Sequence, residues 1–243
     1  MKKLTTNEYW VKEQGNHKFE LEDGNLIECW ITKNIQFNQI NNVIEIGCVP
    51  GKFLTIFGKQ GIEINGLDYI PQVNDLSSVF KNKGYTVGEF IEKDFLNYTP
   101  LKKYDCVTSF GFIEHFDEWE KVVLLHIDYM SKGGYIIIEV PNFRGFFQKI
   151  PRRIFDKNNF RLHNLQAMNL KKIVSLLENN GLEIISAEYF GGYELWFEGR
   201  TRFPNLRNNV VNLFSFIVRN FLFFLPKGHS SFSPVLGVIA KRT

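Results

Sequence analysis

Apolar residues follow two alternating periodicities between Asn42 and Val140. Short runs rich in Val and Ile predict buried strands, and the segments between them carry apolar residues three or four positions apart, which predicts surface helices. This alternation is typical of a parallel sheet covered by helices. The predicted strands cover residues 43–47, 62–68, 86–90, 104–110 and 134–140. The predicted helices cover residues 52–60, 73–83 and 118–130.

The alternation stops at Pro141. Residues 142–165 are polar, basic and aromatic with no clear period, so we expect a long irregular insertion of the kind that often serves as a lid. Regular elements then return as a helix at 169–180 and strands at 182–190 and 234–240. No helix-length crossover is obvious between these last two strands.

The chain therefore predicts a single α/β domain over residues 1–243, built on seven strands that end in a returning pair. Two short helices in residues 5–39 cap the sheet, the second with Asp23 as a predicted N-cap. The predicted parts of the domain are a helical cap at 1–41, a core at 42–140, the lid at 141–168, and a C-terminal part at 169–243 that completes the sheet.

Composition excludes several classes of protein. With 243 residues, 44% hydrophobic and 23% charged, the chain can bury a sizeable core, which argues against a disordered chain, a collagen-like chain or a disulfide scaffold. The net charge of +3 is too small, without a clustered basic face, to predict a nucleic-acid binder. Cys29, Cys48 and Cys106 lack the spacing of a zinc site, so we expect a reducing compartment.

Neither a signal peptide nor a membrane-spanning helix is predicted. The first residues are polar, which favours a cytoplasmic protein. The most apolar stretch, residues 210–225, is interrupted by polar residues and is shorter than the ~20 apolar residues of a spanning helix. We therefore expect no stable insertion into a membrane.

The strongest chemical signal is the segment from Val43 to Phe53, with the sequence VIEIGCVPGKF. It predicts a buried strand that ends in a glycine turn and opens into a helix. Glycines at such a turn let the backbone approach a ligand closely, and the helix that follows presents free N–H groups. A nucleotide-like cofactor is the expected ligand, although the same glycines would also serve the geometry of a turn alone.

Three acidic residues strengthen the prediction of a nucleoside pocket. Glu45 lies near the carboxyl end of its strand, where a buried carboxylate needs a cationic or donor partner. Asp68 follows Gly47 by 21 positions, close to the spacing at which an acidic side chain binds ribose hydroxyls. Asp94 follows the third strand, where it is placed to bind an adenine amino group while Phe95 covers the ring. Each has a simpler alternative, since Asp68 would also cap a turn and Asp94 would also be solvated.

These motifs resemble those of the class I S-adenosylmethionine-dependent methyltransferases, and the resemblance covers residues 43–140 well. The family's glycine motif for the methionine part of the cofactor corresponds to Glu45, Gly47, Val49 and Gly51. This chain departs from the motif at Val49, which replaces the middle glycine. The resemblance implies S-adenosyl-L-methionine as the cofactor and a Rossmann-like, mostly parallel seven-stranded sheet with helices on both faces and an antiparallel last strand.

The same resemblance assigns further residues to the cofactor. It implies that Asp68 binds the ribose and Asp94 the adenine. The positions next to these motifs that we expect to contact the cofactor are Cys48, Tyr69, Phe95 and Phe110. Residues 42–140 are thus the predicted cofactor-binding core.

Two histidines are the candidates for catalysis. His115 follows the fourth strand in the segment SFGFIEHF, which resembles the Glu-His step of relatives that methylate small molecules, including ubiquinone precursors and bacterial surface sugars. An imidazole titrates near neutral pH, which suits a general base that takes a proton from a hydroxyl acceptor. His163, just before a helix, is the second candidate. Either histidine could instead have a purely structural role. No metal is predicted, because no cluster of carboxylates spaced for magnesium stands out.

The candidates for acceptor binding come from the lid and the N-terminus. Arg152, Arg153 and Arg161 are interleaved with aromatic residues, and arginines in a lid bind phosphate oxygens well. A solvated basic face is the simpler explanation for most of them. Tyr9 and Trp10 are expected to close over the cofactor, since aromatic faces attract a sulfonium cation, with core packing as the alternative.

Together these observations predict a methyltransferase that methylates a hydroxyl of a small, anionic molecule, such as a sugar or nucleotide-sugar of bacterial surface polysaccharide. A homodimer is possible for such a chain. An acceptor with a phosphorylated, phosphoramidate or amine group is the nearest alternative. Two other classes stay open: a catalytically silent cofactor-binding partner protein, and an NAD-dependent oxidoreductase, which Glu45 and Asp94 disfavour.

Overall fold

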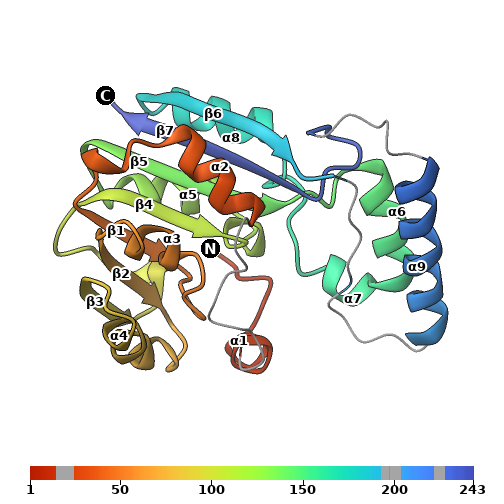
Figure 1. Cartoon of the computed structure of the whole chain (residues 1–243), viewed down its shortest axis with the longest axis horizontal. Coiled ribbons are helices and arrows are strands. Elements are labelled where there is room, and N and C mark those ends of the chain that lie inside the picture. Colours follow the sequence, from red (N-terminus) through yellow and green to blue (C-terminus); the bar gives the residue numbers. More distant parts are fainter. Residues whose placement is uncertain (15–24, 193–196, 198–203, 222–227) are drawn as a thin grey trace.

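One mixed sheet forms the centre of the structure, a computed structural model that describes residues 1–14, 25–192, 197, 204–221 and 228–243. Within these residues seven strands pair in the order β3-β2-β1-β4-β5-β7-β6 (Figure 1). The strands are β1 Asn42–Ile46, β2 Glu63–Asp68, β3 Val87–Glu92, β4 Tyr104–Phe110, β5 Met130–Pro141, β6 Leu182–Phe190 and β7 Val235–Arg242.

The direction of the strands confirms the predicted fold class. Strands β1 to β5 pair in parallel, whereas β7 is inserted antiparallel between β5 and β6. The chain thus has a Rossmann-like, mostly parallel sheet whose last strand runs antiparallel. The strand order reverses beside β1, which pairs with both β2 and β4, and ligands of open parallel sheets bind at the carboxyl edge of such a point.

Helices cover both faces of the sheet (Figure 1). On one face α2, α3 and α4 pack over a cluster that contains Val43 of β1 and Phe80 of α4. On the other face α5 and α8 pack over a cluster that contains Ile44 of β1 and Trp119 of α5. Neighbouring residues of β1 thus point to opposite faces, as strand geometry requires. The helices on the faces are α2 Leu26–Asn34, α3 Leu54–Gly58, α4 Val73–Asn82, α5 Trp119–Ile127 and α8 Leu170–Glu178.

The remaining helices lie near the ends of the chain, within residues 142–165, and in the connections after β3 and β4. They are α1 Asn7–Gln14, α6 Phe146–Phe155, α7 Lys157–Phe160 and α9 Pro204–Phe221, together with the short 3-10 helices η1 Phe37–Gln39, η2 Phe95–Asn97 and η3 Ile113–His115. Figure 1 shows α6 and α9 side by side, far from β3 and α4, and the rings of Phe147 and Phe214 lie 6.3 Å apart between them. None of the helices in the described ranges is long and apolar enough to cross a membrane.

Three predictions about the ends of the chain need correction. The insertion at 142–165 is not irregular, because α6 and α7 form within it, and the segment before β7 contains the long helix α9. Pro151 lies inside α6, where the sequence argues against a helix, although the helix is amphipathic. The predicted cap Asp23 lies outside the described residues, and Asn25 caps α2 by accepting a hydrogen bond from the N–H of Ile27 at 2.9 Å.

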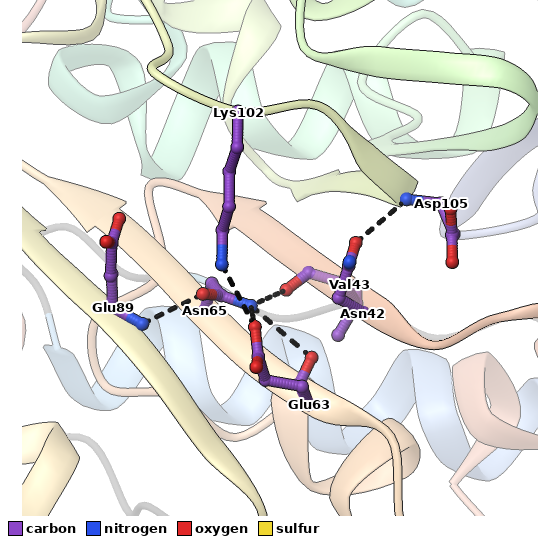
Figure 2. Close-up of polar contacts among 7 residues, drawn as sticks. All are labelled: Asn42, Val43, Glu63, Asn65, Glu89, Lys102 and Asp105. Atoms are coloured by element: carbon purple, nitrogen blue, oxygen red, sulfur yellow. Dashed lines mark hydrogen bonds and ion pairs between the residues drawn. The ribbon is translucent and has the colours of Figure 1, made fainter.

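A buried asparagine fixes the relative positions of β1, β2 and β3 (Figure 2). The pairing of β2 and β3 shifts after Ile64, and the side chain of Asn65 fills the irregularity. Its amide nitrogen donates to the carbonyl of Val43 at 3.1 Å, and its oxygen accepts from the N–H of Glu89 at 2.8 Å. A buried amide that is satisfied on both sides stabilises one register. The carboxyl ends of β1, β2 and β3 therefore have fixed positions relative to one another, at the edge of the sheet where the site lies.

Candidate active site

A cavity of about 470 Å³ opens at the carboxyl edge of the sheet. Its walls come from the loops after β1, β2 and β4, from the end of β5, and from the N-terminal residues. Most of the predicted site residues line it. They are Tyr9, Trp10, Glu45, Gly47, Val49, Gly51, Asp68, Tyr69, Phe110, His115 and His163.

The glycine turn after β1 is required by both conformation and space. Gly47 and Gly51 adopt φ angles of +72° and +91°, which side chains rarely allow. A Cβ atom at Gly47 would lie 2.5 Å from the ring of Phe112, and one at Gly51 would lie 2.9 Å from the ring of Phe80. Val49 has no positive φ, which explains why a side chain is accepted at the middle position of the motif.

Asp68 links the end of β2 to this turn. Its carboxylate accepts hydrogen bonds from the backbone N–H groups of Val49 at 3.1 Å and Ile70 at 3.2 Å. Burial raises the pKa of Asp68 to about 6, although these N–H groups and the charge of Lys3 act in the opposite direction. Asp68 therefore holds the turn, as one of its two expected roles requires, and it also lines the cavity.

Glu45 is a buried carboxylate with an unused acceptor. Burial raises its pKa well above the usual range, while Lys52 and a hydrogen bond from the N–H of Leu54 lower it. Its Oε2 atom has no hydrogen-bond partner among the residues that the structure describes. A buried carboxylate oxygen of this kind costs free energy unless a ligand supplies a donor or a cation.

Glu139 of β5 is a third buried acid on the cavity wall, and the sequence analysis missed it. Burial raises its pKa to about 8, against the attraction of Lys52 and a hydrogen bond from the N–H of Gly111. A single acid within the apolar run at 135–140 is the signal that would have identified it. We refer to Glu45, Asp68 and Glu139 as the carboxylate cluster.

A second group of residues lies where η3 meets the end of α7. Nδ1 of His115 lies 3.0 Å from the carbonyl oxygen of Leu162, and Nδ1 of His163 lies 2.8 Å from that of Asn159. The two imidazole rings have centroids 4.6 Å apart. Because each carbonyl can only accept, both rings carry their proton on Nδ1 and present an Nε2 lone pair.

Glu114 completes this second group, which we call the imidazole cluster: Glu114, His115 and His163. Its Oε1 atom lies 3.8 Å from Nε2 of His115. Burial lowers the pKa of His163 to about 4; the carbonyl of Asn159 opposes this shift and the charge of Arg152 adds to it, so His163 is neutral at neutral pH. The sequence analysis quoted Glu114 within its motif without assigning it a role.

The N-terminal residues pack over the imidazole cluster. Lys3 forms an isolated β-bridge with Phe116, and the N–H of Leu4 donates to the carbonyl of His115 at 2.8 Å. The ring of Trp10 stands edge-on to His115 with centroids 4.9 Å apart. The Tyr9 hydroxyl donates to Asn159 at 3.4 Å. Tyr9 and Trp10 thus line the cavity beside the imidazoles.

Asp94 and Phe95 lie outside the main cavity, although a small neighbouring cavity shares Gly47, Asp68 and Tyr69 with it. Asp94 accepts from the N–H of Leu96 at 3.2 Å and forms an ion pair with Lys3 at 2.9 Å. Lys3 also lies over the ring of Tyr69, 4.3 Å from its centroid. A ligand that reached Asp94 would therefore meet Lys3 first.

The lid arginines do not line the cavity. Arg152 is buried above the ring of Phe143, 3.7 Å from its centroid, and its Nη1 atom lies 3.7 Å from Asp156. Arg153 and Arg161 are exposed to solvent. None of the three predicted arginines lines the cavity, whereas Phe143, just before α6, does.

The other two predicted contacts, Phe110 and Cys48, have opposite outcomes. Phe110 lines the cavity and stacks on Phe53 with centroids 4.2 Å apart. Cys48 is buried on the side of Gly66, where an added Cβ atom would lie 2.5 Å from its sulfur, and it does not line the cavity. Lys52, which the sequence analysis did not assign, does line it.

Comparison with known proteins identifies what this architecture is similar to. The sequence matches a family model described as "Methyltransferase domain" over residues 22–187, more than half of the chain. No curated protein matches the sequence. Among solved structures, a SAM-dependent methyltransferase from Archaeoglobus fulgidus is similar at 20% sequence identity, with 97% of this chain and 99% of that chain covered and a TM-score of 0.58.

Two further solved structures hold S-adenosylhomocysteine. The N-methyltransferase NodS from Bradyrhizobium japonicum WM9 has 10% identity, coverage of 97% of both chains and a TM-score of 0.58. The magnesium protoporphyrin IX methyltransferase from Synechocystis PCC 6803 has 12% identity, coverage of 97% of this chain and 93% of that chain, and a TM-score of 0.57. At these identities the likeness shows the fold, and the named substrates differ widely among the neighbours.

Proposed function

The chain belongs to the methyltransferase-domain family, and from this membership we propose that it transfers the methyl group of S-adenosyl-L-methionine to a hydroxyl of a small molecule, such as a sugar. The observation that carries the proposal is one cavity lined by two different groups, the carboxylate cluster and the imidazole cluster. The first is suited to hold the cofactor and the second to take a proton from the acceptor. The oxidoreductase alternative loses its support through the family match.

The residues of the carboxylate cluster fit the cofactor. The unused Oε2 atom of Glu45 suits the amino group of the methionine part, whose positive charge would keep Glu45 ionised. Asp68, at the end of β2, is placed for the ribose hydroxyls. Gly47 leaves the backbone open to a close approach. When bound, S-adenosylmethionine supplies a methyl group on a positively charged sulfur that becomes neutral after transfer.

His115 is the residue that we propose as the general base. Its Nε2 lone pair belongs to a ring that lines the cavity, and the carbonyl of Leu162 holds the opposite nitrogen. The hydroxyl proton of the acceptor passes to Nε2 as the oxygen bonds to the methyl carbon. His163, neutral beside it, and Trp10 restrict the orientation of the acceptor, and much of the rate comes from this alignment.

The charge of the cavity refines the acceptor class. With Glu139 protonated at neutral pH because of its raised pKa, and Glu45 ionised by the bound cofactor, the acidic residues of the lining still outnumber the lysines: they are Glu13, Glu45, Asp68 and Glu114, against Lys3 and Lys52. An anionic acceptor therefore loses the support that Arg152, Arg153 and Arg161 were expected to give. We favour a neutral sugar hydroxyl over a nucleotide-sugar, and an amine acceptor is the second candidate because acidic residues attract ammonium groups.

Methyl transfer from isotopically labelled S-adenosylmethionine tests the proposal. The purified chain is incubated with separate panels of neutral sugars, nucleotide-sugars and primary amines, and labelled products are detected by mass spectrometry. We expect a labelled methyl ether from a neutral hydroxylated acceptor. If only amines are labelled, the acceptor is an amine and not a hydroxyl. If only nucleotide-sugars are labelled, the acceptor is anionic, as the sequence predicted.

A further inference from the structure

The imidazole cluster has the composition and arrangement of a metal site. One carboxylate oxygen of Glu114 and one ring nitrogen each of His115 and His163 lie within 4.8 Å of one another. The three side chains come from two segments, η3 and the loop after α7, that the fold brings together. All three residues are buried, with exposed fractions of 1%, 6% and 8%.

The orientation of the two imidazoles matches that of metal ligands. A ligating histidine almost always donates its second ring N–H to a carbonyl or carboxylate, which fixes the ring and directs the other nitrogen at the ion. Here the carbonyls of Leu162 and Asn159 take this role for His115 and His163, at 3.0 Å and 2.8 Å. With Nδ1 directed at a carbonyl, Nε2 is the atom of each ring that would bind an ion.

The distances leave room for an ion. With metal–ligand distances of about 2.1 Å, ligand atoms of a tetrahedral site lie about 3.4 Å apart. The separation of 3.8 Å between Oε1 of Glu114 and Nε2 of His115 is close to this value and too long for a hydrogen bond.

We propose that Glu114, His115 and His163 bind one divalent transition-metal cation, such as Zn²⁺ or Mn²⁺. Two imidazole nitrogens and one carboxylate oxygen are a donor set that such ions take, with further positions left open. Because the three residues line the cavity, the open positions face the space for the acceptor. The prediction of no metal considered only carboxylates spaced for magnesium, whereas these histidines lie 48 positions apart in the sequence.

This metal site would refine how the proposed methyltransferase activates its acceptor, and its part in the reaction depends on that proposed function. With an ion bound, His115 would serve as a ligand in place of its proposed role as the base, and the ion would lower the pKa of the hydroxyl that binds it. The O–H bond then breaks with the proton passing to water, the O–CH₃ bond forms and the S–CH₃ bond breaks. The charge of the ion also offsets the acidic lining, which favours an oxygen acceptor over an amine.

Calorimetric titration of the full chain, first dialysed against a chelator, tests the site with Zn²⁺ and, separately, Mn²⁺. We expect one ion per chain. Glu114→Gln and His163→Asn should each weaken the binding at least about 100-fold, because the loss of a ligand exceeds the 10- to 100-fold cost of losing an outer partner. In His163→Asn the new amide can still donate to Asn159, so the fold is preserved. His229→Asn, at an exposed histidine outside the cavity, is the matched control and should bind normally.

Titration of the same preparations with S-adenosylhomocysteine separates the two proposals. Absence of a stoichiometric ion, or ion binding that both ligand variants retain, would overturn the metal site, and normal binding of S-adenosylhomocysteine would then leave the proposed function intact. Absence of S-adenosylhomocysteine binding would contradict the proposed function, while the ion titration would still decide the site.

Discussion

The carboxylate cluster and the imidazole cluster line the same cavity but are held in different ways. Asp68 accepts from the backbone N–H groups of Val49 and Ile70, and Glu139 accepts from that of Gly111. These acids are thus part of the turns that end β1, β2 and β4. His115 and His163 are instead held through Nδ1 by the carbonyl groups of Leu162 and Asn159, and both residues line the cavity.

Because the two clusters are held differently, we expect the carboxylate cluster to determine cofactor binding and the imidazole cluster to determine the rate of methyl transfer. Changes in the carboxylate cluster should alter both the glycine turn and the affinity for the cofactor, because the same oxygens serve both. Changes in the imidazole cluster should alter turnover and leave the turn and the cofactor half in place. The predictions below test this division.

The largest expected effect is that of His115→Asn on turnover. The amide can still donate to the carbonyl of Leu162, whereas the Nε2 atom is lost. We expect turnover of S-adenosylmethionine with an accepted hydroxyl substrate to fall at least about 100-fold, because both roles proposed for His115, general base and metal ligand, need its Nε2 atom. Binding of S-adenosylhomocysteine should change less than twofold. Loss of both turnover and S-adenosylhomocysteine binding in this variant would contradict the assignment of separate roles to the two clusters.

A smaller effect is expected for Glu45→Gln, which keeps the shape of the side chain and removes its charge. Since a hydrogen bond to a charged group contributes about 1.5–3 kcal/mol, S-adenosylhomocysteine should bind at least about 10-fold more weakly. Glu89→Gln, at an exposed position of β3, is the matched control and should bind as the unchanged chain does. Equal affinities of the two variants, measured by calorimetry, would remove Glu45 from the cofactor site.

The stability of the chain should depend on Glu139 with a definite sign. Its pKa of about 8 in the folded state lies above the unfolded value, so the folded state binds more protons between these values. Unfolding free energy should therefore fall as the pH rises from 5 to 8, by about 1 kcal/mol per pH unit relative to Glu139→Gln. Urea unfolding of both chains at several pH values measures this difference, and parallel curves would contradict it.

His126 should act in the opposite direction, outside the cavity. This histidine of α5 is fully buried against Phe95 and Phe112, and burial lowers its pKa to about 4, against a hydrogen bond to the carbonyl of Val122. The unfolded state binds more protons below pH 6.5, so stability is lost as the pH falls toward 4. Relative to His126→Gln, the chain should lose about 1 kcal/mol between pH 6.5 and 5.5. A gain in relative stability over this interval would show that His126 is protonated in the folded state.

The sequence predicted the parts of the molecule that depend on local patterns. The β-branched runs identified the strands, and Gly47 and Gly51 identified a turn that the positive φ angles require. Glu45 and Asp68 followed from their positions at strand ends. The helix α6 was missed although its apolar residues share a face, because Pro151 within it is typical of a helix end.

The imidazole cluster could be predicted only in part, since its geometry is tertiary. His115 and His163 were each chosen from local sequence, but their contact depends on how α7 packs against η3. Glu114 and Glu139 looked ordinary in the sequence and are unusual only because they are buried. Conversely, Arg152 looked suited to bind a phosphate, and the structure places it above Phe143 instead.

Calorimetric titration with S-adenosylhomocysteine, carried out on the unchanged chain and on Asp68→Ala, tests the central claim most directly. We expect one molecule bound per chain and binding about 100-fold weaker in the variant, because Asp68 both holds the glycine turn and faces the cavity. Circular dichroism of the variant shows whether it remains folded. Failure of the folded, unchanged chain to bind S-adenosylhomocysteine would contradict the account.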